Sequence, residues 1–144
     1  MSSITVRVDG NPAPGGSKRH IGNGRMVDAG KNNRPWRDTV AWNARDQYQG
    51  QPMAGPLAVV VTFTVPHLAS HRRKDGTLKD SIGQPTKRPD LTKLWRAVED
   101  ALTGILWIDD AQIVIQSVCK QYGPVPGVRV VVTQLEAAAA AGGK

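Results

Sequence analysis

The stretch Leu57-Ala-Val-Val-Val-Thr-Phe-Thr-Val65 carries the strongest β-strand pattern in the sequence. Every second residue is apolar, which gives the strand one continuous apolar face, and Val60 is apolar on the opposite face. Apolar residues on both faces are typical of a strand that lies inside a sheet. We therefore expect residues 57–65 to form an interior strand, around which the other elements are arranged.

Three further strands are predicted from alternating apolar and polar residues, at residues 4–9, 111–120 and 128–135. A shorter strand is expected around residues 25–28. The turn Gly123-Pro-Val-Pro-Gly127 separates the last two long strands, and a turn of this length predicts that they pair as a β-hairpin.

Two helices are predicted between the strands. Residues 34–49 have Asn33 as the expected N-cap. The apolar face of this helix consists of Trp36, Val40, Ala44 and Tyr48. A second amphipathic helix follows Pro89, with Asp90 at its N-cap position, and ends at Gly104. Residues 66–89 show no periodicity and predict a long loop, which is either functional or a simple insertion.

The element order is β-β-α-β-α-β-β. It predicts one α+β domain, with a mixed β-sheet and two helices packed on it. We expect this domain to span residues 1–136. The alanine- and glycine-rich residues 137–144 are expected to form a low-complexity tail.

The charge of the chain points to a polyanionic partner. Nineteen lysine and arginine residues against twelve aspartate and glutamate residues give a net charge of +7. Eight of the basic residues lie in residues 1–50 and seven in residues 67–93. Nucleic acid is the usual partner of such a protein, and a basic protein without a polyanionic partner is the alternative.

Several function classes are excluded by pattern. No apolar run approaches the roughly 18 residues of a membrane helix, and the N-terminal segment lacks the order of a signal peptide. We expect a cytoplasmic protein without membrane contact. Cys119 is the single cysteine, which excludes an internal disulfide and argues against a cysteine-based zinc site. No glycine-rich phosphate loop occurs, so no organic cofactor is expected.

Histidines and aspartates are the remaining candidates for chemistry. His20, His67 and His71 lie in predicted loops without metal-ligand spacing, and we interpret them as solvated, with a phosphate contact from the basic loops as the alternative for His20 and His71. Asp90 precedes the second helix, and Asp109-Asp110 follows it. If these carboxylates converge, Mg²⁺ would relieve their repulsion and lower the pKa of a water that attacks a phosphodiester. The alternatives are a simple N-cap for Asp90 and a solvated turn for the pair.

A longer motif contains these aspartates: Lys87-Arg-Pro-Asp-Leu-Thr-Lys-Leu-Trp-Arg-Ala-Val-Glu-Asp-Ala-Leu-Thr-Gly-Ile-Leu-Trp-Ile-Asp-Asp-Ala-Gln-Ile113. It resembles the signature of the RusA family of Holliday-junction resolvases, common in phages and prophages. That signature has Asp-x-Asp-Asn-Leu, a lysine one helical turn later, Asp-Ala-Leu, and then Asp-Asp-x-Gln. The earlier segment Asn11-Pro-Ala-Pro-Gly-Gly-Ser-Lys-Arg19 is similar to the family's proline-rich, basic N-terminal loop.

The resemblance implies roles for individual residues. Asp90 matches the first aspartate of the motif, and Asp109 and Asp110 match the later pair, with Asp110 the better match to its catalytic member. Arg96 stands where the family has its functional lysine. Thr92 replaces the second expected aspartate, and it is a weaker metal ligand through its hydroxyl or through water. Lys93 replaces an asparagine.

We therefore predict a homodimeric, Mg²⁺-dependent endodeoxyribonuclease, with Mn²⁺ as a second candidate ion, that resolves four-way or other branched DNA by paired cuts in recombination and repair. Its expected location is the cytoplasm of a bacterial or phage-infected cell. The DNA-binding surface is expected to contain Lys18, Arg19, Arg72, Arg73, Lys74, Lys87, Arg88 and Lys93.

Two alternatives stay open. Thr92 suggests a catalytically weak or inactive branched-DNA-binding protein, and carboxylates that serve only as caps and turns would fit a structural domain. Glu99 either pairs with Arg96 or helps the site. Trp42 and Trp107 are candidates for the dimer surface, because they lie off the clearest core faces.

Overall fold

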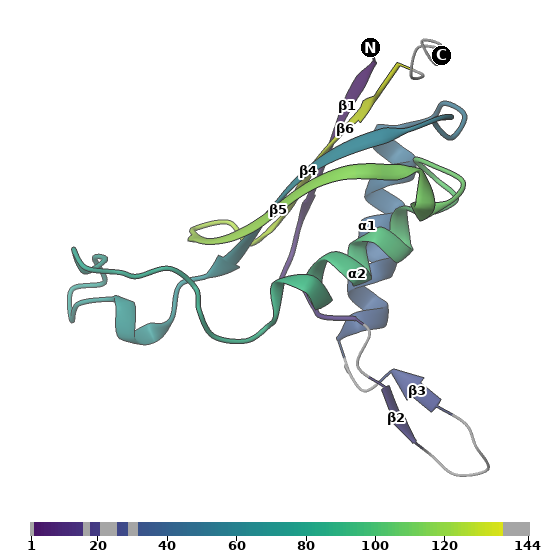
Figure 1. Cartoon of the computed structure of the whole chain (residues 1–144). Helices are drawn as coiled ribbons and strands as arrows, with labels where there is room; N and C mark the ends of the chain where they lie inside the picture. Colours follow the sequence, from purple (N-terminus) through teal and green to yellow (C-terminus); the bar gives the residue numbers. More distant parts are fainter. Residues whose placement is uncertain (1, 16–17, 21–25, 29–31, 137–144) are drawn as a thin grey trace.

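The computed structural model describes residues 2–15, 18–20, 26–28 and 32–136. The predicted tail, residues 137–144, lies outside the described residues. The elements are β1 (Ser3–Asp9), β2 (Lys18–His20), β3 (Met26–Asp28), α1 (Asn33–Gln47), β4 (Leu57–Pro66), a short 3-10 helix η1 (Ala69–His71), α2 (Leu91–Leu102), a second short 3-10 helix η2 (Asp110–Gln112), β5 (Ile113–Gly123) and β6 (Gly127–Gln134). The fold is α+β, with a mixed four-stranded sheet and two helices, and it confirms the predicted class (Figure 1).

The sheet has the strand order β1-β6-β4-β5. β4 is an interior strand, as predicted, and it pairs in parallel with β5 and antiparallel with β6. The predicted hairpin of the last two strands is wrong, because β5 and β6 are separated by β4. A strand, a helix and a second strand normally form a parallel pair, and β4, α2 and β5 follow that rule.

β5 is one of the two edge strands of the sheet, and it begins with an irregularity. Its register with β4 shifts between Leu57 and Ala58, so that Val114 of β5 has no pairing partner on β4. Val114 and Ile115 lie at this shift and are 61% and 57% exposed. The strand thus starts with apolar side chains in solvent next to Asp110.

Both helices pack on one face of the sheet (Figure 1). The core between them contains the alternating residues of β1, β4 and β6 and the apolar face of α2. Trp107 is fully buried in this core, so its predicted place on a dimer surface is wrong, while Trp42 is 70% exposed. Asn33 is not the N-cap of α1, because Asn32 takes that position and Asn33 is the buried first residue of the helix.

Two segments extend from this body in Figure 1. One is the antiparallel ribbon of β2 and β3, where the sequence predicted only the second strand and a loop for residues 18–20. The other is the chain between β4 and α2, residues 67–89, which we call the basic arm. No helix in the described ranges combines the length and apolar character that a membrane span requires.

Gly127 permits the close approach of β6 and β1. A Cβ atom at this position would lie 2.2 Å from the carbonyl oxygen of Val8, which is fixed backbone. We expect Gly127→Ala to lower the free energy of unfolding by about 1–3 kcal/mol, in the range of overpacked sites. Gly83→Ala is the control, because a Cβ there meets no atom within 4 Å. Urea unfolding of both variants tests this, and equal midpoints would contradict it.

Candidate active site

Asp90 occupies the N-cap position of α2 without making a cap. Its side chain accepts no hydrogen bond from the backbone of the first turn. The carboxylate lies 4.0 Å from the ammonium group of Lys93, and the Asp90 side chain is 61% exposed. The carboxylate is therefore accessible to a ligand, and the simple N-cap interpretation has no hydrogen bond to support it.

The backbone before Asp90 is fixed by a lysine of the edge strand. Lys120 on β5 donates hydrogen bonds from its ammonium group to the carbonyl oxygens of Lys87, at 2.8 Å, and Pro89, at 2.7 Å. Charge-assisted bonds of this kind are stronger than neutral ones. This role of Lys120 could not be predicted from the sequence, in which Lys120 is only one polar residue of an alternating strand.

Asp109 has a structural role at the other end of α2. Its carboxylate accepts a hydrogen bond from the backbone N–H of Ala111, at 2.8 Å, and so caps η2. Gln112 completes the turn. Its amide oxygen accepts from the N–H groups of Ile108 and Asp109, and its amide nitrogen donates to the carbonyl oxygens of Met53 and Gly55. The glutamine of the motif thus anchors this turn to the chain before β4.

Asp110 lies beside Glu99 of α2. Burial raises the pKa of the Glu99 carboxyl above its ordinary value of 4.5, and the nearby charges of Asp110 and Asp100 raise this pKa further. Arg96 acts in the opposite direction and lowers the pKa. The structure therefore brings Asp110, Glu99 and Arg96 into one electrostatic group.

The two ends of α2 separate the predicted carboxylates. Asp90 precedes the first residue of this twelve-residue helix, which is about 18 Å long. Asp109 and Asp110 lie after its last turn, at the start of η2. Among the residues that the structure describes, no group of three or more histidine, cysteine, aspartate or glutamate side chains is placed to hold a metal ion. One chain alone thus does not provide the expected three-aspartate site.

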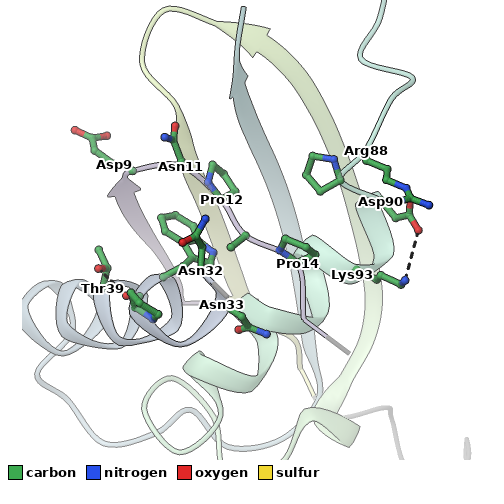
Figure 2. Close-up of a pocket in the computed structure, with 15 residues that line it drawn as sticks. Asp9, Asn11, Pro12, Pro14, Asn32, Asn33, Thr39, Arg88, Asp90 and Lys93 are labelled. Carbon is green, nitrogen blue, oxygen red and sulfur yellow. Dashed lines mark hydrogen bonds and ion pairs between the residues drawn. The ribbon is translucent and has the colours of Figure 1, made fainter. Parts of the chain in front are cut away.

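A cleft of about 920 Å³ opens beside Asp90, between the N-terminal ends of the two helices (Figure 2). Residues 9–14 line it and belong to the proline-rich segment after β1. This segment is held against α2, because the N–H of Gly15 donates to the carbonyl oxygen of Lys93 at 2.8 Å. A Cβ on Gly15 would lie 3.1 Å from the Cα of Ala97, so the close approach favours glycine.

Comparison with known proteins identifies the family. The sequence model described as Endodeoxyribonuclease RusA matches residues 9–133. The chain belongs to the RusA family. Its match includes both ends of α2 and the segment that lines the cleft. A curated relative, the uncharacterized protein YqaN of Bacillus subtilis (strain 168), is 28% identical over 143 residues, which cover 95% of this chain and 100% of the relative.

Membership of the RusA family makes the positions of the predicted DNA-binding residues relevant. Lys18 and Arg19 lie on β2 of the small ribbon. Arg72, Arg73 and Lys74 lie on the basic arm. Lys87, Arg88 and Lys93 flank Asp90, at the junction of the arm with α2.

The basic arm has a hydrogen-bonded turn of its own. Arg72 and Leu78 form an isolated β-bridge, and the guanidinium group of Arg72 donates to the carbonyl oxygen of Gly76 at 2.9 Å. Arg73 donates to the carbonyl oxygen of Leu78 and forms an ion pair with Asp80 at 3.2 Å. Both partners of this ion pair are exposed, so it contributes little stability. The arm is thus an ordered loop that carries cations.

The histidines of the arm are packed together and are not simply solvated. The rings of His71 and Tyr122 lie 4.6 Å apart, and those of His67 and Tyr122 lie 5.6 Å apart. Desolvation lowers the pKa of the His71 imidazole, and the charges of His67, Lys79 and Lys87 lower this pKa further. This ring cluster fastens the start of the arm to the end of β5.

Proposed function

We propose that this protein is an endonuclease that cuts four-way or other branched DNA, acts as a homodimer and requires Mg²⁺ or Mn²⁺. The proposed place of action is the cytoplasm of a bacterial or phage-infected cell. The observation that carries the proposal is the family match over residues 9–133, together with exposed carboxylates at two positions of the family motif, Asp90 and Asp110.

The roles of the side chains follow from their surroundings. Asp90 and Asp110 supply the carboxylates of the site. Asp90 makes no cap hydrogen bond to α2, and the cap of η2 is Asp109 and not Asp110. Asp109 and Gln112 position Asp110 through the turn that they form. Arg96 binds a phosphate oxygen, a role suited to a guanidinium group, which keeps its charge at every working pH.

Two chains are needed to bring these carboxylates together. Asp90 and Asp110 lie at opposite ends of α2, and the described residues of one chain contain no group of three or more histidine, cysteine, aspartate or glutamate side chains that could hold a metal ion. We propose that a two-fold partner places its Asp110 near Asp90 of the first chain. The exposed apolar residues Val60, Val114 and Ile115, on β4 and β5, favour burial against a second copy. Two such sites would cut two strands symmetrically.

The direct test is incubation of the protein with an end-labelled four-way junction. Reactions contain Mg²⁺, Mn²⁺ or EDTA, and the products are separated on a denaturing gel. We expect paired cuts at symmetric positions in the presence of either metal, with a linear duplex of the same sequence as the control. Intact junction strands under all metal conditions would contradict the proposal.

The basic arm is expected to bind phosphates of the DNA. For the double variant Lys74→Ala/Lys87→Ala, we expect weaker binding of four-way DNA and a less steep dependence of log K on log salt, by about one unit per lysine. The control is Arg45→Ala, which removes a cation from the last turn of α1. Fluorescence anisotropy at several salt concentrations measures the affinity and the salt slope of each variant. A salt slope of the double variant equal to that of the native protein would show that these lysines do not contact the DNA.

A second candidate function is a branched-DNA-binding protein without cleavage. Thr92, an exposed residue in the first turn of α2, favours it, because this position lacks the carboxylate of the family motif. If the site binds a metal, Thr92→Asp should raise the cleavage rate or lower the Mg²⁺ concentration required, since a hard cation prefers carboxylate ligands. Thr92→Asn is the uncharged control. Junction binding with no cut in any of the three proteins would favour the second function.

A further inference from the structure

The cleft beside Asp90 has two chemically different sides. The apolar side consists mainly of four prolines, Pro12, Pro14, Pro35 and Pro89, while Trp36, which also lines the cleft, is only 4% exposed. The charged side contains Arg88 and Lys93, which flank Asp90, and Figure 2 shows these three side chains together at one side of the opening. A ligand that fits both sides has a flat apolar part and an anionic group.

Neutral polar groups lie between these sides. The side chains of Asn11, Asn32 and Thr39 line the cleft and are exposed. Amide side chains offer both hydrogen-bond donors and acceptors, as the edge of a nucleobase does. A volume of about 920 Å³ lies within the range of small-molecule sites, and it is too small for a DNA duplex.

We propose that this cleft receives one unpaired nucleotide of the bound DNA. Its base lies against the prolines of the apolar side of the cleft, and its phosphate lies between Arg88 and Lys93. The inference rests on the proposed nuclease function and extends it, because it assigns a single-stranded nucleotide to a site next to the carboxylate of Asp90.

Branched DNA makes such a nucleotide available. A base in a continuous duplex must be unpaired and unstacked before it enters a protein pocket, and this costs free energy. The cost is smaller where the continuous base stack is already interrupted, as at the crossover of an open four-way junction, because a base pair next to the crossover lacks one stacking neighbour. Capture of a base would therefore make binding of branched DNA tighter than binding of duplex DNA. This preference would not depend on contacts with the arms of the junction.

The test uses four-way junctions that carry one abasic site at successive positions around the crossover. Binding is measured by anisotropy without added divalent metal. Stacking of one base on an aromatic side chain changes affinity by roughly fivefold to 150-fold, and we take the lower end of this range for a surface made mainly of prolines. We expect a loss of about tenfold at one abasic position and small changes at the others.

Two substitutions of Thr39 show whether the cleft causes the loss of affinity at the sensitive abasic position. Thr39 is exposed on α1, lines the cleft and donates its hydroxyl to the carbonyl oxygen of Pro35. Thr39→Phe fills the cleft and Thr39→Ala enlarges it, and both lose the same hydrogen bond. The sensitive abasic position should remain in Thr39→Ala and disappear in Thr39→Phe. Equal behaviour of the two variants, or no sensitive position in the native protein, would overturn the inference.

A second arm of the experiment needs neither a junction nor cleavage. A short single-stranded oligonucleotide is compared with its abasic counterpart in the native protein and in both Thr39 variants. Tighter binding of the intact strand in the native protein and Thr39→Ala, but not in Thr39→Phe, supports the cleft even if no junction is cut. Cleavage of the junction without any abasic effect in either arm would overturn base capture and leave the nuclease function intact.

Discussion

Asp110→Asn is expected to reduce cleavage of a four-way junction by at least about 100-fold, because loss of a group that only supports a metal ligand already costs about 10–100-fold. The substitution keeps the size of the side chain and removes its charge. Asp110 lies next to Glu99, whose carboxyl has a raised pKa because of burial and of neighbouring negative charge. Neighbouring like charges are costly unless a cation or a proton compensates them, and a divalent ion would do so.

Two controls separate the charge of Asp110 from the shape of its turn. Asp109→Asn keeps an oxygen that accepts the hydrogen bond from Ala111, so we expect a smaller loss of activity than for Asp110→Asn. Asp38→Asn removes an exposed carboxylate from α1 and should have no effect on the rate. Cleavage rates are measured at saturating junction, with binding checked separately. If Asp110→Asn cleaves at the native rate, the assignment of Asp110 is wrong.

The local elements of this fold could be predicted from single stretches of sequence. Residues 57–65 and the helix after Asp90 have patterns that depend only on their own residues, and both were correct in type and place. The pairing of the last two strands could not be read from the turn between them. It depends on α2, which crosses from β4 to β5 and so places β5 beside β4 in parallel.

The separation of the aspartates has a similar cause. The chain after α2 turns locally, and Trp107 bridges back to Thr103 and also to Met53, so that Asp109 and Asp110 stay near the end of the helix. The strand that follows, β5, runs back toward the start of α2. It is β5 that brings Lys120, and not Asp110, to the residues before Asp90. Motif spacing predicted the candidate residues but gave no information about these tertiary contacts.

Side-chain roles were the least predictable feature. Asp90 and Asp109 both occupy cap positions, yet only Asp109 makes the cap hydrogen bond. The two aspartates look alike in sequence, but the carboxylate of Asp90 lies 4.0 Å from the ammonium group of Lys93, whereas that of Asp109 accepts the backbone N–H of Ala111. A predicted cap position therefore does not decide whether a carboxylate is available for a ligand.

Mixing two inactive variants should restore cutting if the site is formed by two chains. In a hybrid dimer of Asp90→Asn and Asp110→Asn, one site combines the intact Asp110 of the first chain with the intact Asp90 of the second. The other site carries both substitutions. We expect each variant alone to be inactive and the mixture to nick one strand. A single-chain site predicts the opposite, because no chain in the mixture has both carboxylates.

A supercoiled plasmid with an extruded cruciform distinguishes the outcomes. The native protein should convert it to the linear form by paired cuts, and the hybrid should give only the nicked circle, because it has one intact site. Exchange of subunits is verified with two affinity tags, so that hybrid dimers are known to be present. Hybrid dimers without nicking activity would show that each chain holds its own site. In that case Asp90 and Asp110 would have to approach each other by a rearrangement of α2 and η2 on DNA binding.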